Sequence, residues 1–330
     1  MIRPVLAGAA AIGLAVVSPA TAQRSVSVRW HLVADVPLPG SASRFDYQSL
    51  DSVMGRLWIA HMGADEVLGF DVRARRVVAR VPDLPRPTGV LAVPGLGRVY
   101  VSLSRAGAVA VLDAVSGRVL ARVPGGRFPD GLDYAPPSGK LFVSDEHGRQ
   151  ELIVEVGSGQ AHPPIPLGGE AGNTRYDAVS GRIWVAVQTR NELAAIDPAR
   201  ESVTVRIPVP GIEGPHGFQL DPAHGWAYVT GEGNARLAVV DLASGRVLHT
   251  YPVGHEPDVV AVDPGRGRLF VASEAGTIAA FDISGDSLVR LPAYDAPQAH
   301  SVAVDPATHL VYVPLANIGG RPVMRILRLE

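Results

Sequence analysis

A short motif, in which an aromatic residue stands between two apolar residues, recurs along almost the whole chain. The central aromatics of its seven copies are Trp58, Tyr100, Phe142, Trp184, Tyr228, Phe270 and Tyr312. Successive aromatics are 42 residues apart in every interval except the fourth, which spans 44. Repeats of this length with several short apolar runs are typical of propeller blades. The motif therefore predicts one ring of seven similar units.

Each repeat has room for four short strands. In the fifth repeat we expect them at 216–221, 226–230, 237–242 and 247–253. An acidic residue such as Asp241 ends the third strand and precedes a Ser-Gly-Arg turn, where an Asp side chain caps the turn. The aromatics lie in mid-strand, so we expect them to pack between neighbouring blades. The sequence predicts an all-β, seven-bladed β-propeller with four antiparallel strands per blade.

The two ends of the chain indicate how the ring closes. After Tyr312 there are residues for one further strand, at 323–329, so the seventh repeat lacks its outermost strand. The segment 30–39 resembles a fourth strand. We expect the mature N-terminal strand to complete the last blade, which removes an open sheet edge.

The first 23 residues have the pattern of a signal peptide. Arg3 gives a positive start, residues 5–17 are apolar, and Ala20-Thr21-Ala22 is typical of a cleavage site. An apolar stretch of this length is too short to span a bilayer, which needs roughly 20 residues. We therefore expect cleavage near Ala22, a periplasmic or secreted protein without a membrane span, and one propeller domain at 24–330.

Composition excludes several kinds of site. The chain has no cysteine, which excludes disulfides, thiolate metal sites and covalent haem attachment. The net charge is -2, and Lys140 is the only lysine among 30 basic residues. Binding to a phosphate backbone depends on clustered Lys and Arg, so we expect no nucleic-acid partner. We expect a monomer.

One position in each repeat, 12 residues before the aromatic, is expected to face the central channel. The residues at these seven ring positions are Asp46, Thr88, Asp130, Gly172, His216, Asp258 and His300. Imidazole and carboxylate are ligands for divalent metals, and the candidate metal ligands are Asp46, Asp130, His216, Asp258 and His300. The same groups could supply acid and base, or form the solvated polar lining of a channel.

Further polar residues lie in the loops on the same face as these ring positions. Near the ring positions are Arg44, Arg86, Asn173, Arg175 and His255. The loops between second and third strands carry His61, Asp145, Glu146, His147, Gln188, Glu232, Asn234, Glu274 and Asn317. Variable loops on a rigid scaffold are where function usually resides.

The fifth repeat resembles the YVTN family of β-propeller repeats, the YncE-like proteins. The residues that carry this resemblance are Tyr228-Val229-Thr230, Leu237-Ala238-Val239-Val240-Asp241 and Tyr251-Pro252-Val253-Gly254. Gly231 replaces the Asn that often follows in the family. The resemblance extends over nearly the whole mature chain. It implies an exported propeller that binds a small molecule or a periplasmic protein, and it leaves the cofactor unknown, with a divalent metal possible.

An enzyme of the lactonase or lyase type is the alternative. Gly214-Pro215-His216-Gly217 and Ala299-His300-Ser301 look like stretches of seven-bladed lactonases. On this reading His216 or His300 would be the base, and Arg44 or Arg175 would stabilise an oxyanion. Metal-dependent lactonases use carboxylate and Asn ligands in a ring of fewer blades. A redox accessory role has little support, because the haem-attachment motif is absent.

Overall fold

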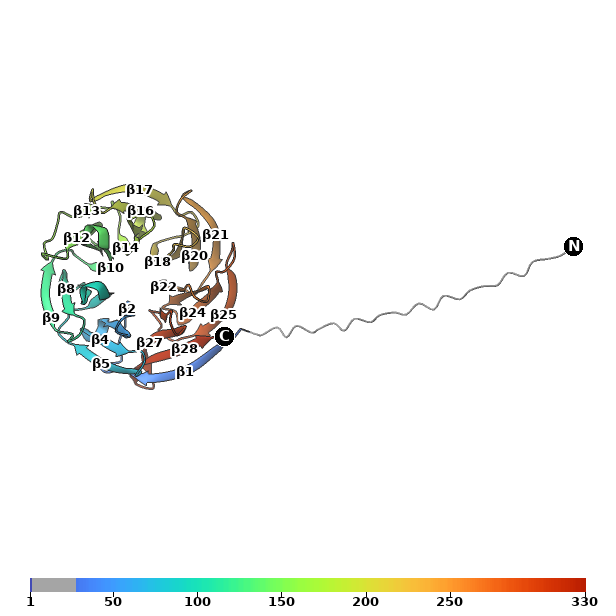
Figure 1. The fold of residues 1–330 in the computed structure, drawn as a ribbon, viewed down its shortest axis with the longest axis horizontal. Coiled ribbons are helices and arrows are strands. Elements are labelled where there is room, and N and C mark those ends of the chain that lie inside the picture. Colours follow the sequence, from blue (N-terminus) through green and yellow to red (C-terminus); the bar gives the residue numbers. More distant parts are fainter. Residues whose placement is uncertain (2–27) are drawn as a thin grey trace.

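The computed structural model describes Met1 and residues 28–330. The strands form seven four-stranded antiparallel sheets. Figure 1 shows these sheets following one another in a ring. The predicted all-β, seven-bladed propeller is therefore confirmed. The expected signal peptide, 1–23, lies outside the described segment. Within residues 28–330 no helix is long and apolar enough to cross a membrane.

The strands occupy four concentric positions in the ring. The innermost are β2 (Gln48–Asp51), β6 (Pro87–Val93), β10 (Pro129–Ala135), β14 (Ala171–Asp177), β18 (Pro215–Asp221), β22 (Pro257–Asp263) and β26 (Ala303–Asp305). The second strands are β3 (Arg56–His61), β7 (Arg98–Leu103), β11 (Lys140–Asp145), β15 (Arg182–Val187), β19 (Trp226–Gly231), β23 (Arg268–Ser273) and β27 (Leu310–Ile318).

The third strands are β4 (Glu66–Asp71), β8 (Ala108–Asp113), β12 (Gln150–Glu155), β16 (Glu192–Asp197), β20 (Arg236–Asp241), β24 (Thr277–Asp282) and β28 (Arg321–Leu329). The outermost strands are β5 (Arg76–Val81), β9 (Val119–Pro124), β13 (Ile165–Pro166), β17 (Ser202–Pro208), β21 (Arg246–Pro252), β25 (Val289–Asp295) and β1 (Trp30–Pro37). Short 3-10 turns are η1 (Met62–Ala64), η2 (Pro94–Leu96), η3 (Pro136–Ser138) and η4 (Gln188–Arg190).

The last blade combines strands from both ends of the described segment. Its strand order is β1-β28-β27-β26, and β1 pairs antiparallel with β28, with Trp30 opposite Leu329. The indole Nε1 of Trp30 also donates a hydrogen bond to Pro292 O of the preceding blade, at 2.7 Å. These contacts join the first and last parts of the ring.

The repeated aromatics form the core between blades. All seven are 2% exposed or less. Tyr228 of the fifth blade, for example, belongs to one apolar cluster with Leu269 and Val271 of the sixth. The outer strands alternate between exposed and partly buried residues, as in β5, because one face of an outer strand meets solvent. The predicted role of the aromatics is confirmed.

A bulge in the innermost strands shapes the channel. The pairing of β14 with β15 shifts between Ala171 and Thr174, and β6, β10, β18 and β22 show the equivalent shift. A bulge adds a residue to one strand and redirects side chains. The bulge lies at the ring position. Side chains of consecutive residues there therefore do not simply alternate between the two faces of the strand.

Candidate functional site

A cavity of about 230 Å³, here called the mouth chamber, collects most of the predicted ring. It is lined by Arg44, Asp46, Tyr47, Met62, Arg86, Thr88, Phe128, Asp130, Glu146, His216, Glu232, Asp258, Glu274 and His300. Every ring position except Gly172 contributes. The five predicted metal ligands therefore lie in one cavity, together with three glutamates from the loops between second and third strands.

His300 is enclosed by carboxylates. Its Nε2 lies 2.9 Å from Asp46 Oδ1 and 2.9 Å from Asp258 Oδ2, and its Nδ1 lies 2.9 Å from Glu274 Oε1. Burial lowers the pKa of His300, but the Asp258 and Asp46 carboxylates outweigh it and hold the pKa well above the usual value. Arg44 Nη2 lies 3.1 Å from His300 Nδ1 and 2.9 Å from Glu274 Oε1, which keeps Glu274 against the ring.

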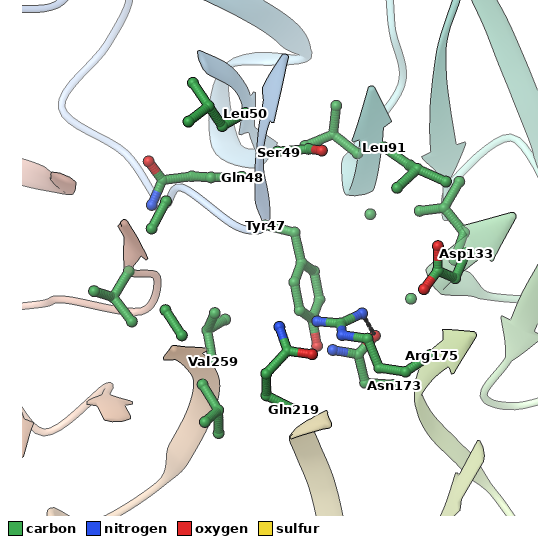
Figure 2. A pocket seen from close by; sticks show the side chains of 18 of the residues that line it. Tyr47, Gln48, Ser49, Leu50, Leu91, Asp133, Asn173, Arg175, Gln219 and Val259 are labelled. Carbon is green, nitrogen blue, oxygen red and sulfur yellow. Dashed lines mark hydrogen bonds between the residues drawn. The ribbon is translucent and has the colours of Figure 1, made fainter. Parts of the chain in front are cut away.

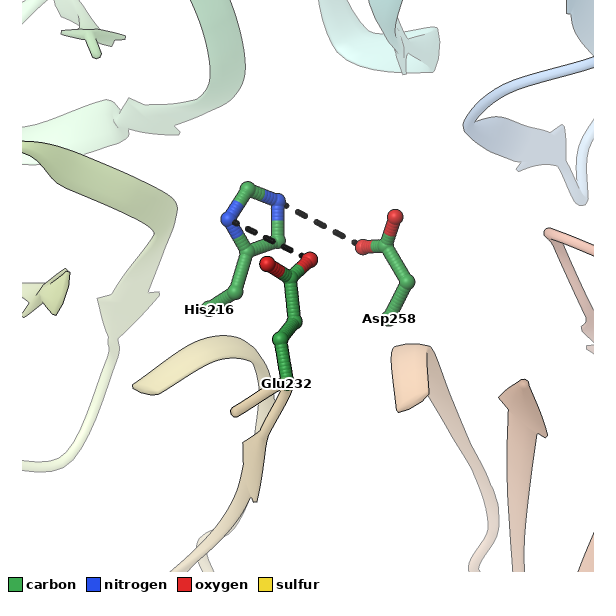
Figure 3. Close-up of side chains that lie close together, drawn as sticks. All are labelled: His216, Glu232 and Asp258. Atoms are coloured by element: carbon green, nitrogen blue, oxygen red, sulfur yellow. Dashed lines mark ion pairs between the residues drawn. The ribbon is translucent and has the colours of Figure 1, made fainter. Parts of the chain in front are cut away.

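His216 also contacts the Asp258 carboxylate, through the oxygen that His300 does not contact (Figure 3). Its Nε2 is 3.4 Å from Asp258 Oδ1 and 3.6 Å from Asp130 Oδ2, while Nδ1 is 3.9 Å from Glu232 Oε1. His216 is 7% exposed, and its Nδ1 has no hydrogen-bond partner in the described segment. Burial lowers the pKa of His216, but Asp258, Glu232 and Asp130 raise it to about 9.

Asp258 connects the two halves of the mouth chamber. Two three-residue groups place one ligand atom from each residue within 4.8 Å of the others: His216, Glu232 and Asp258, and Asp258, Glu274 and His300. Mixed nitrogen and oxygen donors at such spacing suit a divalent metal. Asp258 belongs to both groups, and its carboxylate could bridge them.

The mouth chamber has an excess of acidic groups. It contains six carboxylates, from Asp46, Asp130, Glu146, Glu232, Asp258 and Glu274, against the guanidinium groups of Arg44 and Arg86. Burial, together with the Asp46 carboxylate, raises the pKa of Asp130 to about 8. Burial acts to raise the pKa of Asp258, but His300 and His216 lower it below its usual range. Even with Asp130 protonated, the five other carboxylates outnumber the four basic side chains of Arg44, Arg86, His216 and His300, so the chamber favours a cation.

Tyr47 forms the floor of the mouth chamber. Its hydroxyl lies 3.3 Å from His216 Nε2 and donates to Asp258 Oδ1 at 3.3 Å. The same ring also lines a second cavity of about 310 Å³, here called the inner chamber. Figure 2 shows Tyr47 in that cavity beside Gln219, Asn173 and Arg175. The side chain of Tyr47 therefore separates two parts of the channel.

The predicted catalytic residues fall on both sides of Tyr47. Arg44, His216 and His300 line the mouth chamber, whereas Arg175 lines only the inner chamber. Arg175 stands three residues after its ring position, and the equivalent residues of all seven blades line the inner chamber. The structure thus places Arg175 away from the two histidines with which the sequence grouped it.

A buried network fixes the loop that carries Arg44, Asp46 and Tyr47. The Nε2 of His61 is hydrogen-bonded to Ser43 Oγ at 3.2 Å, and its Nδ1 is hydrogen-bonded to Glu66 Oε1 at 3.1 Å. Phe45 stacks on the His61 ring at 4.1 Å, and Gly63 N donates to Arg44 O at 2.9 Å. His61, a candidate by sequence, thus has a positioning role and lies outside the mouth chamber.

The other loop candidates divide in the same way. Glu146, Glu232 and Glu274 reach the mouth chamber. Asp145 instead accepts the backbone amides of Arg127 and Phe128 and holds Phe128 in place. The remaining candidates that line neither chamber are His147, Gln188, Asn234, His255 and Asn317.

Sequence reasoning did not identify Tyr47, Met62 or Phe128. A signal for Tyr47 was present in the repeats. The residues that follow the ring position in the other blades are Gly89, Gly131, Asn173, Gly217, Val259 and Ser301. A tyrosine at a position that is otherwise small or short marks a side chain that fills the channel.

Comparisons with known proteins show the fold alone. No family model and no curated protein matches the chain. Virginiamycin B lyase from Staphylococcus aureus is similar in structure, with 13% identity and a TM-score of 0.75 over 92% of this chain and 100% of the other. A streptogramin B lyase has 13% identity and a TM-score of 0.75, covering 91% and 98%. Kuenenia stuttgartiensis hydrazine synthase has 16% identity and a TM-score of 0.73, covering 89% and 97%.

Proposed function

We propose that this chain is an exported propeller of the YVTN-repeat, YncE-like type whose mouth chamber binds a divalent cation and acts on a small carbonyl compound as a lactonase or lyase. The observation that carries the proposal is the sharing of Asp258 by two groups of potential ligands. Export is supported by the pattern of residues 1–23, and family membership by the repeat motifs.

The ligand chemistry supports a cation. Carboxylate oxygens from Asp258 and Glu274 and a nitrogen of His300 would form one ligand set, and His216, Glu232 and Asp258 the other. The unpartnered Nδ1 of His216 is a second observation that points to a missing ligand, because a buried polar atom without a partner is costly. A divalent cation supplies a Lewis acid that polarises a carbonyl oxygen.

The remaining groups of the chamber support acid and base roles for the chain itself. Asp130 Oδ2 lies 3.6 Å from His216 Nε2, the nitrogen that also lies 3.3 Å from the Tyr47 hydroxyl. A carboxyl group kept protonated by burial can donate a proton to a leaving oxygen. Arg44, beside Glu274, can bind a developing negative charge at the rim. The names of two similar structures, both lyases, agree with this reaction class.

A binding protein without catalysis is the second candidate. It is favoured by the acidic excess of the mouth chamber, which would also accept an organic cation such as an amine. The small volume of about 230 Å³ favours a small molecule over a protein surface as the ligand of this chamber.

Metal content tests the proposal. The mature chain, treated with a chelator and then titrated with Mn²⁺ in a calorimeter, is expected to bind with defined stoichiometry. A His216→Ala/His300→Ala double variant is expected to lose this binding. The matched control replaces two exposed histidines, His249→Ala/His255→Ala, and retains it.

Catalysis is tested on the metal-loaded protein with a panel of lactones and esters. Ring opening that requires both the metal and the two histidines supports the enzyme. Metal binding without any turnover leaves the binding protein as the function, and absence of metal binding by the wild type overturns the cation-dependent proposal.

A further inference from the structure

The inner chamber differs in kind from the mouth chamber. One wall, from the third to fifth blades, is polar and carries Asp133, Asn173, Arg175 and Gln219. The opposite wall, from the sixth and seventh blades, is apolar and includes Val259, Ala261, Val302 and Ala303. Figure 2 shows Asn173, Arg175 and Gln219 beside the ring of Tyr47, with Val259 on the other side.

Arg175 brings a guanidinium group into this chamber, near enough to the Asp133 carboxylate to oppose the burial that raises the pKa of Asp133. Its Nη1 donates to Asn173 Oδ1 and to Thr174 O, both at 2.8 Å. No ion pair of Arg175 occurs within residues 28–330. The nearby Asp133 is engaged elsewhere, because its two oxygens accept the backbone amides of Tyr134 and Tyr176, each at 2.8 Å.

Asn173 adds a second donor. Its side chain is 1% exposed, and its Oδ1 accepts from Arg175 and from Thr174 N. Its amide Nδ2 has no hydrogen-bond partner in the described segment. A buried amide nitrogen without an acceptor costs about 1–3 kcal/mol, so a ligand oxygen that reached Nδ2 would stabilise it.

Gln219 adds a further amide donor to the polar wall. Its Oε1 accepts the backbone amide of Leu220 at 3.0 Å, which directs its acceptor atom to the strand and leaves its amide nitrogen as a donor. The polar wall therefore combines one guanidinium with two amide donors, and its one carboxylate already accepts two hydrogen bonds. A ligand that fits must supply acceptor oxygens.

We propose that the inner chamber is a second binding site, for a small aliphatic carboxylate. The carboxylate oxygens accept from Arg175 and Asn173, since guanidinium groups pair with carboxylates through two parallel hydrogen bonds. The alkyl group lies against the valine and alanine wall of the sixth and seventh blades. The cavity of about 310 Å³ is at the lower end of the range for small-molecule pockets.

The experiment is a titration of the mature chain with isobutyrate in a chloride-free buffer, followed by NMR of the ligand. Isobutyramide, which has the same shape without the charge, is the comparison ligand. We expect saturable binding of isobutyrate and at least tenfold weaker binding of the amide. Arg175→Gln is expected to weaken isobutyrate binding at least tenfold.

Two further variants distinguish loss of the binding site from misfolding of the Arg175→Gln variant. Ala303→Leu fills the apolar wall and leaves every donor in place, so it too is expected to abolish isobutyrate binding. Arg200→Gln, which removes a largely exposed arginine, is the matched control and is expected to bind like the wild type. Absence of saturable binding to the wild type would show that the chamber does not take isobutyrate, and equal binding by Arg175→Gln would show that the ligand binds without the guanidinium; either result would overturn the proposal.

Discussion

The two chambers of the channel are built on the same seven innermost strands and have opposite chemistry. The ring positions line the mouth chamber and supply mainly carboxylates and imidazoles. The residues three positions later line the inner chamber and supply one guanidinium (Arg175), one amide (Gln219), one carboxylate (Asp133), one hydroxyl (Ser49) and three apolar side chains. Three residues of strand advance roughly 10 Å. On the two proposals made above, one rigid scaffold presents a cation site and an anion site separated by the side chain of Tyr47.

The largest effect on ligand affinity is expected from replacing one charged side chain in each chamber, Asp258 in the mouth chamber and Arg175 in the inner chamber. Asp258→Asn removes the carboxylate shared by both ligand groups and is expected to weaken Mn²⁺ binding at least 100-fold, about 2.8 kcal/mol. Isobutyrate binding is expected to stay unchanged in this variant. Arg175→Gln is expected to weaken isobutyrate binding and to leave Mn²⁺ binding unchanged. Calorimetry with Mn²⁺ and ligand NMR measure the two affinities.

The control for this pair of variants is Asp295→Asn, which removes an exposed carboxylate on β25. It should alter neither affinity. If Asp258→Asn weakened both ligands equally, the two chambers would not be separate sites.

The next largest effect is expected where the innermost strands of the fifth and sixth blades lie close together, at Gly217 and Asp258. A Cβ on Gly217 would lie 1.3 Å from Asp258 O, so Gly217→Ala must displace the backbone that carries Asp258. We expect a loss of about 2 kcal/mol in the free energy of unfolding, together with weaker Mn²⁺ binding. Denaturant titration provides the measurement.

Gly157→Ala is the matched control, because its Cβ would meet no atom within 4 Å. Its free energy of unfolding should match that of the wild type within about 0.5 kcal/mol. Equal stability of Gly217→Ala and the wild type would contradict the tight fit between the fifth and sixth blades.

A smaller effect is expected at the partition itself. Tyr47→Phe keeps the ring between the chambers but removes the hydroxyl that contacts His216 and Asp258. We expect a loss of about 1 kcal/mol in the free energy of unfolding, the net value of a typical hydrogen bond. The inner chamber keeps its isobutyrate affinity, because its donors are untouched.

Tyr134→Phe serves as the comparison, since no hydrogen bond of its hydroxyl occurs in residues 28–330. Chemical denaturation of both variants isolates the contribution of the Tyr47 hydroxyl. A result in which the two variants are equally stable would remove Tyr47 from the polar network.

The smallest effect is a pH dependence of the loop that positions Arg44 and Asp46. Burial lowers the pKa of His61 below its usual value, despite the opposing influence of Glu66. The folded state therefore favours neutral His61, and its contribution to stability is complete above pH 6.5 and falls as the pH decreases below it. Unfolding measured between pH 8 and pH 5 should show this component in the wild type.

His61→Asn lacks the titrating group and provides the reference curve. The difference between the two curves isolates His61 from the carboxylates that titrate in the same range. Parallel curves would mean that His61 is not held in its neutral form.

Much of this architecture could be predicted from the sequence, because seven regularly spaced aromatics specify both the blade number and the core between blades. The ring positions were predictable for the same reason. Asp46, Asp130, His216, Asp258 and His300 each precede an aromatic by a constant interval, and all five line one cavity.

The division of the channel could not be predicted in the same way. The bulge at the ring position changes strand alternation, so proximity in sequence to a ring residue does not tell which chamber a side chain enters. Arg175 was grouped with His216 and His300 for this reason. The size of Tyr47, in contrast to Gly89 and Gly131, was visible in the sequence, but its role as a partition depends on its orientation in three dimensions.

The most direct test of the central claim is anomalous diffraction from crystals of the mature chain soaked in Mn²⁺. The account predicts an anomalous peak in the mouth chamber, in contact with Asp258 and with His216 or His300, and no peak in the inner chamber. A fully soaked crystal with no peak at Asp258, or with its strongest peak beside Arg175, would contradict it.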